Sequence, residues 1–128
     1  MDFLREAARV LKPGGTLALT DIIPRSGIDP ATYMRGEKTL GSGICLDNLD
    51  NAYHADVYAR HLREAGFEAV RIESIVDWTR LPFAQALDAM GARDGGARGA
   101  GWQRTAARLR QLIDLGEDYV LVVARRAR

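Results

Sequence analysis

Residues 3–23, FLREAARVLKPGGTLALTDII, decide the fold class of this chain, because they predict an amphipathic helix, an abrupt turn and a buried strand. Apolar residues at three- and four-residue spacing form one helical face, opposite a charged face. The sequence Pro13-Gly14-Gly15 then ends the helix, since proline cannot continue the hydrogen bonding and glycine permits a tight reversal. The apolar face consists of Phe3, Leu4, Ala7, Ala8 and Leu11.

The strand predicted at residues 16–23 is almost entirely apolar, and its last polar group is Asp21. A strand of this composition is typical of a sheet that is covered on both faces. Residues 24–50 follow with scattered prolines and glycines, which indicates an irregular lid containing one short helix near residues 30–36.

The remaining sequence alternates between helical and extended patterns. The run from residue 91 to residue 101 holds five glycines and is expected to be slack, breaking the helix before it. Gly66 and Gly116 are expected to cap helices. The predicted elements are helices at residues 51–65, 82–90 and 102–113, and strands at residues 67–76 and 119–124. Three strands separated by helices predict an α/β fold.

Three of these features, in this order, resemble class I S-adenosylmethionine-dependent methyltransferases. They are the PGG turn before a strand with an acidic end, the AGF junction at residues 65–67, and the last strand at residues 119–125. The segment from residue 78 to residue 116 is similar to the late lid of O-methyltransferases that act on sterols and glycosylated natural products. The resemblance covers nearly the whole chain but only the second half of such an enzyme.

The resemblance implies a partial Rossmann-like sheet of the last three strands, with the final strand antiparallel between the other two. Residues 1–128 would form one domain, the C-terminal, substrate-side part of the enzyme, with lid segments at residues 24–50 and 78–116. S-adenosylmethionine would be the cofactor, although the glycine-rich turn after a first strand has no counterpart in this sequence. The edge of the first strand would then favour a homo-oligomer or a separate cofactor-binding half as partner.

The composition of the chain argues against nucleic-acid binding, a membrane span and an internal disulfide. The net charge of +1, from 18 basic and 17 acidic residues, gives no field that would attract nucleic acid. No apolar run approaches the length of a membrane span. The single cysteine, Cys45, cannot form an internal disulfide and is interpreted as a small packed residue, as expected in a reducing cytoplasm.

Candidate catalytic residues follow from the chemistry of methyl transfer to a hydroxyl, which needs alignment, exclusion of water and a base. Asp21 ends a strand at the edge where open α/β sheets bind ligands, but it could instead bind its own backbone at the turn. His54 could act as a base, or it could be a surface residue. His61 falls between apolar positions and is interpreted as structural.

Aromatic and thioether side chains in or beside the lid segments would suit an apolar, ring-containing acceptor, although each could equally be core. They are Tyr33, Met34, Tyr53, Trp78 and Phe83. The resemblance therefore implies the acceptor side of a small-molecule methyltransferase whose cofactor half is missing, and we expect the isolated chain to bind no cofactor. The alternative is a non-catalytic remnant that serves as a dimerisation or interaction module.

Overall fold

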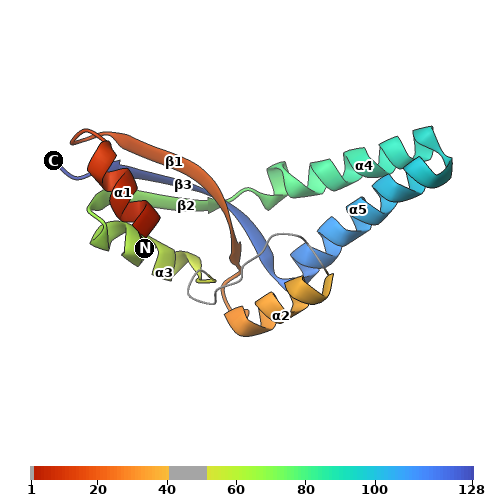
Figure 1. Cartoon of the computed structure of the whole chain (residues 1–128), viewed down its shortest axis with the longest axis horizontal. Coiled ribbons are helices and arrows are strands. Elements are labelled where there is room, and N and C mark those ends of the chain that lie inside the picture. The colour runs from red at the N-terminus through yellow and green to blue at the C-terminus, as the bar shows by residue number, and fades with distance from the viewer. Residues whose placement is uncertain (1, 41–51) are drawn as a thin grey trace.

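The computed structural model describes residues 2–40 and 52–128 (Figure 1). Residues 41–51, which include Cys45 and part of the 24–50 segment, lie outside the described residues. The described elements confirm a mixed α/β chain. In chain order they are α1 (Asp2–Val10), β1 (Thr16–Pro24), α2 (Pro30–Leu40), α3 (Ala55–Glu64), β2 (Phe67–Ser74), the 3₁₀ turn η2 (Val76–Trp78), α4 (Arg80–Asp94), α5 (Gly96–Leu115) and β3 (Glu117–Arg126).

The described strands form one sheet in the order β1-β3-β2, and β3 runs antiparallel to both neighbours. The last strand of the chain therefore lies between the other two, as the resemblance implied. The register places Asp21 opposite Val120 and Ile22 opposite Tyr119. A bulge interrupts the pairing of β2 between Glu68 and Arg71, where Ala69 has a positive φ of 49°. The fold class predicted from the sequence is confirmed.

One face of the sheet carries the main core. Helices α1 and α3 pack there, and their side chains join those of all three strands in one buried cluster. The opposite face of β1 is exposed at Thr16, Ala18 and Thr20, so the expectation that this strand is covered on both faces was wrong for the chain as described. Buried members of the cluster are Leu4, Ala8, Ile23, Tyr58, Leu62, Phe67, Val120, Val122 and Ala124.

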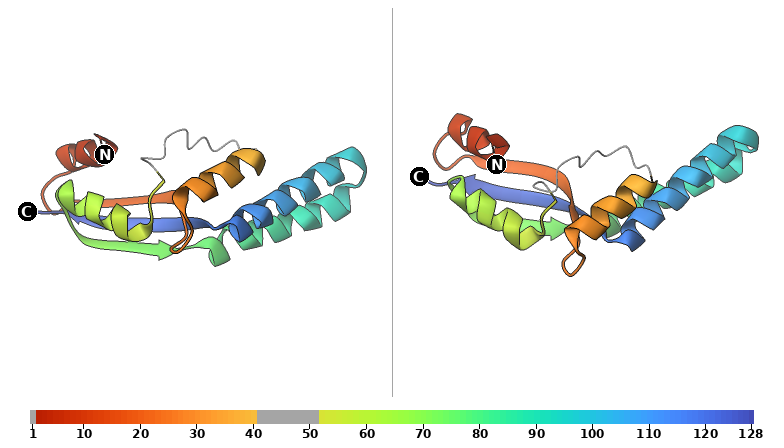
Figure 2. Two further views of the ribbon diagram at one scale, coloured as in Figure 1. Left: turned by 90° about the horizontal axis from the view of Figure 1, so that it is seen from below. Right: turned by 60° about the horizontal axis from the view of Figure 1, so that its bottom comes forward.

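The glycine run does break the helix, as expected, but only at Gly95 and Gly96, and the expectation that the whole run is slack was wrong. Helix α4 continues to Asp94, a turn at Gly95 and Gly96 uses positive φ values of 64° and 54°, and α5 starts within the run. The two helices lie side by side as a hairpin that extends away from the sheet (Figures 1 and 2). They approach so closely that a Cβ on Gly99 would lie 2.4 Å from the carbonyl oxygen of Gly91. Glycine is therefore a packing residue here, and its lack of a side chain sets the distance between the helices.

Several boundaries differ from those predicted, because side-chain patterns do not fix where a helix ends. Helix α2 continues to Leu40 instead of ending near residue 36, and α3 begins at Ala55 instead of residue 51. The predicted cap at Gly116 is confirmed, with a left-handed φ of 113°. Phe3, assigned to the apolar face of α1, is 64% exposed. No helix in the described ranges is long and apolar enough to cross a membrane.

Candidate active site

Asp21 lies near the carboxyl end of β1, and each of its two carboxylate oxygens accepts a hydrogen bond. Its Oδ1 accepts a hydrogen bond of 2.8 Å from the backbone N–H of Ile22, and its Oδ2 accepts one of 2.9 Å from the hydroxyl of Tyr58. Because Tyr58 is buried on α3, the Asp21 carboxylate points toward the helix-covered face of the sheet. Both sequence interpretations of Asp21 remain compatible with this placement, since a carboxylate has lone pairs beyond the two bonds.

Tyr53 and His61 form an aromatic cluster with Tyr58, the donor to Asp21. The ring of Tyr53 makes edge-to-face contacts with Tyr58 at 5.1 Å and with His61 at 4.9 Å, measured between ring centroids. Burial, followed by the negative charge of Asp21, raises the pKa values of Tyr53 and Tyr58 above their ordinary value. The half-buried position of His61 agrees with the structural role predicted for it.

His54 is half-buried at the N-cap of α3 rather than at the surface. Its Nε2 lies 2.7 Å from the backbone carbonyl oxygen of Ile28. Since a carbonyl oxygen only accepts, Nε2 must carry the proton of this bond, and Nδ1 is then the basic nitrogen of the neutral ring. His54 therefore links the loop before α2 to the start of α3.

A pocket of about 280 Å³ opens beside the end of β1, and we call it the Arg80 pocket. Ile22 and Tyr119 belong to its lining and are directly paired on β1 and β3. Because successive strand residues point to opposite faces, the pocket lies on the face of the sheet away from Asp21. The guanidinium carbon of Arg80 lies 4.9 Å from the centroid of the Tyr119 ring. The lining consists of Ile22, Thr79, Arg80, Phe83 and Tyr119.

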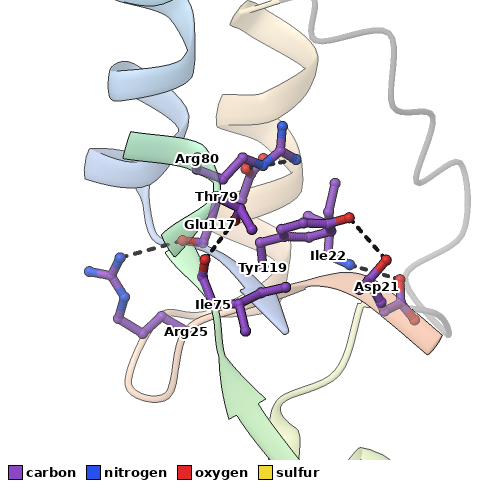
Figure 3. A network of polar contacts seen from close by, with 9 residues as sticks. Asp21, Ile22, Arg25, Ile75, Thr79, Arg80, Glu117 and Tyr119 are labelled. Atoms are coloured by element: carbon purple, nitrogen blue, oxygen red, sulfur yellow. Dashed lines mark hydrogen bonds and ion pairs between the residues drawn. The ribbon is translucent and has the colours of Figure 1, made fainter. Parts of the chain in front are cut away.

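Behind the Arg80 pocket lies a buried polar group at the junction of α2, α4 and β3 (Figure 3). Nη2 of Arg80 lies 3.1 Å from Oε1 of Glu117, whose side chain is fully buried. Burial raises the pKa of Glu117, and the charge of Arg80 opposes this shift. Glu37 and Tyr33 are buried close enough for their charges and those of Glu117 and Arg80 to interact, and the Tyr33 hydroxyl has no hydrogen-bond partner in the described structure.

The structure distributes the sequence candidates over several environments. Phe83 alone among the five lines the Arg80 pocket, and it is half exposed. Trp78 is 78% exposed, Tyr33 is fully buried, and Met34 on α2 is half-buried. Tyr53 packs against the core on the other face of the sheet.

Sequence reasoning did not identify Arg80, Glu117, Tyr119 or Tyr58 as site residues. Glu117 directly follows the cap at Gly116, a position at which a charged residue indicates solvent exposure. Only the packing of α4 against the start of β3 brings Arg80 to it, so no local signal could have found this pair.

Comparisons with known proteins agree with this architecture. The chain is 40% identical over 88 residues to erythromycin 3''-O-methyltransferase of Saccharopolyspora erythraea, covering 64% of this chain and 28% of that protein. It is 33% identical over 132 aligned positions to 27-O-demethylrifamycin SV methyltransferase of Amycolatopsis mediterranei, covering 96% of this chain and 46% of that protein. The chain is a relative of the class I S-adenosylmethionine-dependent methyltransferases. No protein-family model matches it.

Solved structures show the same fold. A candidate sarcosine dimethylglycine methyltransferase from Galdieria sulphuraria superposes with a TM-score of 0.67 at 19% identity, over 97% of this chain and 46% of that one. The [4+2]-cyclase SpnF superposes with a TM-score of 0.53 at 28% identity, over 97% of this chain and 43% of that one. The chain thus spans less than half the length of each of these relatives.

The described residues do not fit a complete site for S-adenosylmethionine. Dinucleotide and related sites use a glycine-rich turn between a strand and a helix N-terminus. Gly14 and Gly15 follow a helix, and the turn from β1 to α2 contains the single glycine Gly27. The described part of the chain therefore lacks the glycine-rich cofactor turn.

Proposed function

We propose that the chain forms the acceptor side of an S-adenosylmethionine-dependent methyltransferase that methylates a hydroxyl of a small molecule in the cytoplasm. The observation that carries the proposal is the β1-β3-β2 sheet with its antiparallel central strand, in a chain that matches a rifamycin methyltransferase over 96% of its length. The O-methyltransferase name of the erythromycin relative supports a hydroxyl as the methyl acceptor.

In this proposal Asp21 is the catalytic base, and Tyr58 positions it. The Tyr58 hydroxyl fixes one carboxylate oxygen while lone pairs remain to accept the proton of the substrate hydroxyl. His54 is a second candidate base through Nδ1, since Nε2 is occupied by the Ile28 carbonyl. The bound cofactor would supply the electrophilic methyl group, and these side chains would orient the acceptor and take its proton.

The segments 24–50 and 78–116 act as the lid over the acceptor. They include α2 and the α4–α5 hairpin, which meet where Gly36 faces Leu115 so closely that a Cβ would lie 2.5 Å from Cδ1. Phe83 and the exposed Trp78 offer aromatic surface to a ring-containing acceptor. Tyr33 and Met34 belong to α2 of the same lid, whereas Tyr53 packs beside Tyr58 on the Asp21 face of the sheet.

The cofactor side is proposed to come from a further segment of polypeptide or from a second copy of the chain. Among the described strands β1 pairs only with β3, so its other edge can accept a strand. Without such a partner we expect no cofactor binding. The second candidate function, a non-catalytic remnant that dimerises through this edge, is supported by the lack of a cofactor turn in the residues described.

Calorimetric titration of the purified chain with S-adenosylhomocysteine tests whether this chain binds the cofactor without a partner. No heat is expected from a folded sample, and micromolar binding would instead mean that the chain builds a cofactor site by itself. Light scattering over a wide concentration range then distinguishes a monomer from an assembly through the β1 edge.

The catalytic assignment is tested in an enzyme completed with a cofactor-binding segment, supplied in the same polypeptide or as a separate chain. Asp21→Asn should lower turnover much more than cofactor affinity, and Asp56→Asn, on the exposed surface of α3, should change neither. Unchanged turnover in Asp21→Asn would remove Asp21 from the mechanism. Failure of the completed enzyme to methylate any hydroxylated macrolactone, despite cofactor binding, would favour the remnant.

A further inference from the structure

We propose that the Arg80 pocket is a specificity subsite for a neutral, oxygen-bearing ring of the acceptor, and that Arg80 determines this specificity. The inference rests on the proposed function, because it assumes a small-molecule acceptor, but it concerns the opposite face of the sheet from Asp21. The pocket would therefore hold a part of the acceptor that lies away from the reacting hydroxyl.

Size and lining favour a single ring system. Pockets that enclose a whole drug-sized molecule measure roughly 300 to 1,000 Å³, and the Arg80 pocket measures about 280 Å³. Ile22, Phe83 and Tyr119 give it apolar and aromatic walls. Such walls pack against the carbon faces of a ring, while a large macrolactone would have to remain mostly outside.

The charge of Arg80 is already balanced by the protein. Glu117 lies 3.1 Å from Nη2 and is fully buried, and the Tyr119 ring faces the guanidinium from a second side. An anionic ligand would lose its hydration on entry and find a cation that is already paired. The pocket should therefore reject phosphates and carboxylates in favour of uncharged groups.

Arg80 nevertheless retains hydrogen-bonding capacity. Its guanidinium has five N–H donors, and the ion pair with Glu117 engages Nη2. The Nε–H is buried and has no hydrogen-bond partner in the described structure. Because the Nε–H has no accessible surface, a hydroxyl, ether or carbonyl oxygen seated in the pocket would pair instead with N–H groups in the 17% of the side chain that is exposed, and the Nε–H would report on that contact. The Glu117 carboxylate acts here as a positioning group that fixes the guanidinium.

Nuclear magnetic resonance on the purified, ¹⁵N-labelled chain tests this inference with two matched probes. Methyl rhamnopyranoside provides a neutral oxygenated ring, and rhamnose 1-phosphate adds an anion to the same ring. We expect the neutral probe to shift the Nε–Hε signal of Arg80 and the ring signals of Phe83, with the phosphate binding at least about tenfold more weakly, a difference of about 1.4 kcal/mol. Tighter binding of the phosphate, or an Arg80 signal that neither probe moves, would overturn the assignment.

Two variants and a control locate the binding. Arg80→Lys keeps a cation beside Glu117 but removes the planar donor fork, and it should abolish the response to the neutral probe. Phe83→Ala changes a half-exposed residue, so it should weaken binding without unfolding the chain. Arg93→Lys, exposed near the far end of α4, should leave binding unchanged. Retained binding in both Arg80→Lys and Phe83→Ala would contradict the inference.

This experiment can fail independently of the proposed function, because it involves neither cofactor nor methyl transfer. If the pocket binds the neutral ring but the protein never methylates, the subsite proposal stands and the proposed function is rejected. If a completed enzyme methylates while Arg80→Lys and Phe83→Ala leave acceptor affinity unchanged, the proposed function stands and the subsite proposal is rejected.

Discussion

Replacing Gly99 by alanine is expected to destabilise the α4–α5 hairpin relative to the same replacement at Gly101, two residues further along α5. A Cβ on Gly99 would lie 2.4 Å from the carbonyl oxygen of Gly91 and 3.3 Å from its carbonyl carbon. A Cβ on Gly101 would have only the tip of Arg104 nearby, at 3.9 Å. The two positions therefore share a helix and differ in the space around them.

The expected magnitudes follow from these distances. Alanine gains about 1 kcal/mol over glycine in a helix interior, so Gly101→Ala should raise the free energy of unfolding by roughly 0.5 to 1 kcal/mol. At Gly99 the obstacle is backbone, which cannot rotate away, and the helices must separate. Overpacking of this kind costs typically about 1 to 3 kcal/mol, which cancels or exceeds the helical gain. Gly99→Ala should therefore be about 1 to 3 kcal/mol less stable than Gly101→Ala.

Urea denaturation followed by far-UV circular dichroism measures both variants against the parent chain. Trp102 provides a local readout, since its Nε1 donates to Oδ2 of Asp94 across the hairpin at 3.1 Å. Its fluorescence can be isolated by replacing the exposed Trp78 with phenylalanine. Equal stability of Gly99→Ala and Gly101→Ala would refute the argument that glycine sets the distance between the helices.

Three further predictions concern buried polar groups. Tyr58→Phe removes the donor to the Asp21 carboxylate and should lower the free energy of unfolding by about 1.5 to 3 kcal/mol in urea titrations. Burial raises the pKa values of Tyr33 and Tyr58 above that of unfolded tyrosine, which ionises near pH about 10. The contribution of the two buried hydroxyls to stability is therefore complete below that pH and is lost as the pH rises further. Urea denaturation midpoints that stay constant above that pH would contradict this prediction. Glu117→Gln removes the buried carboxylate that is paired with Arg80 and should cost about 3 kcal/mol, whereas adding Arg80→Met should restore most of the loss. A double-mutant cycle without this coupling would show that the pair does not act as a unit.

The sequence predicted the first helix, the PGG turn and the first strand because these are local signals. Periodic apolar residues need no distant partner to be recognised, and neither does the cap at Gly116. The position of β3 between β1 and β2 came from the resemblance to methyltransferases, since spacing alone does not order strands in a sheet.

The glycine run shows where local reasoning was only partly right. Low helix propensity predicts a break, which occurs at Gly95 and Gly96, but it does not predict that the other glycines of the run are helical. In the folded chain Gly91 and Gly99 face each other, and close packing of the two helices compensates for that low propensity. The contact joins two helices, so no single-helix pattern contains it.

Some residues of the candidate site could be identified from the sequence, whereas their partners are brought to them only by the tertiary structure. Asp21 was identifiable because it ends an apolar strand, but its partner Tyr58 is 37 residues away and reaches it only through the packing of α3 on the sheet. Phe83 was identifiable as an aromatic residue of the lid segment, whereas its neighbours in the pocket, Arg80 and Tyr119, come together only when α4 and β3 meet.

By itself the sequence determined the α/β class, the type of each element and the acidic end of the first strand, since these depend on residues within one or two turns of one another. The tertiary structure alone decided that Asp21 and Ile22 serve opposite faces of the sheet, that Glu117 neutralises Arg80, and that Gly99 meets backbone. The physical reason is that burial, charge pairing and close packing are properties of surfaces brought together from distant segments, and their free energies arise only once those surfaces are in contact.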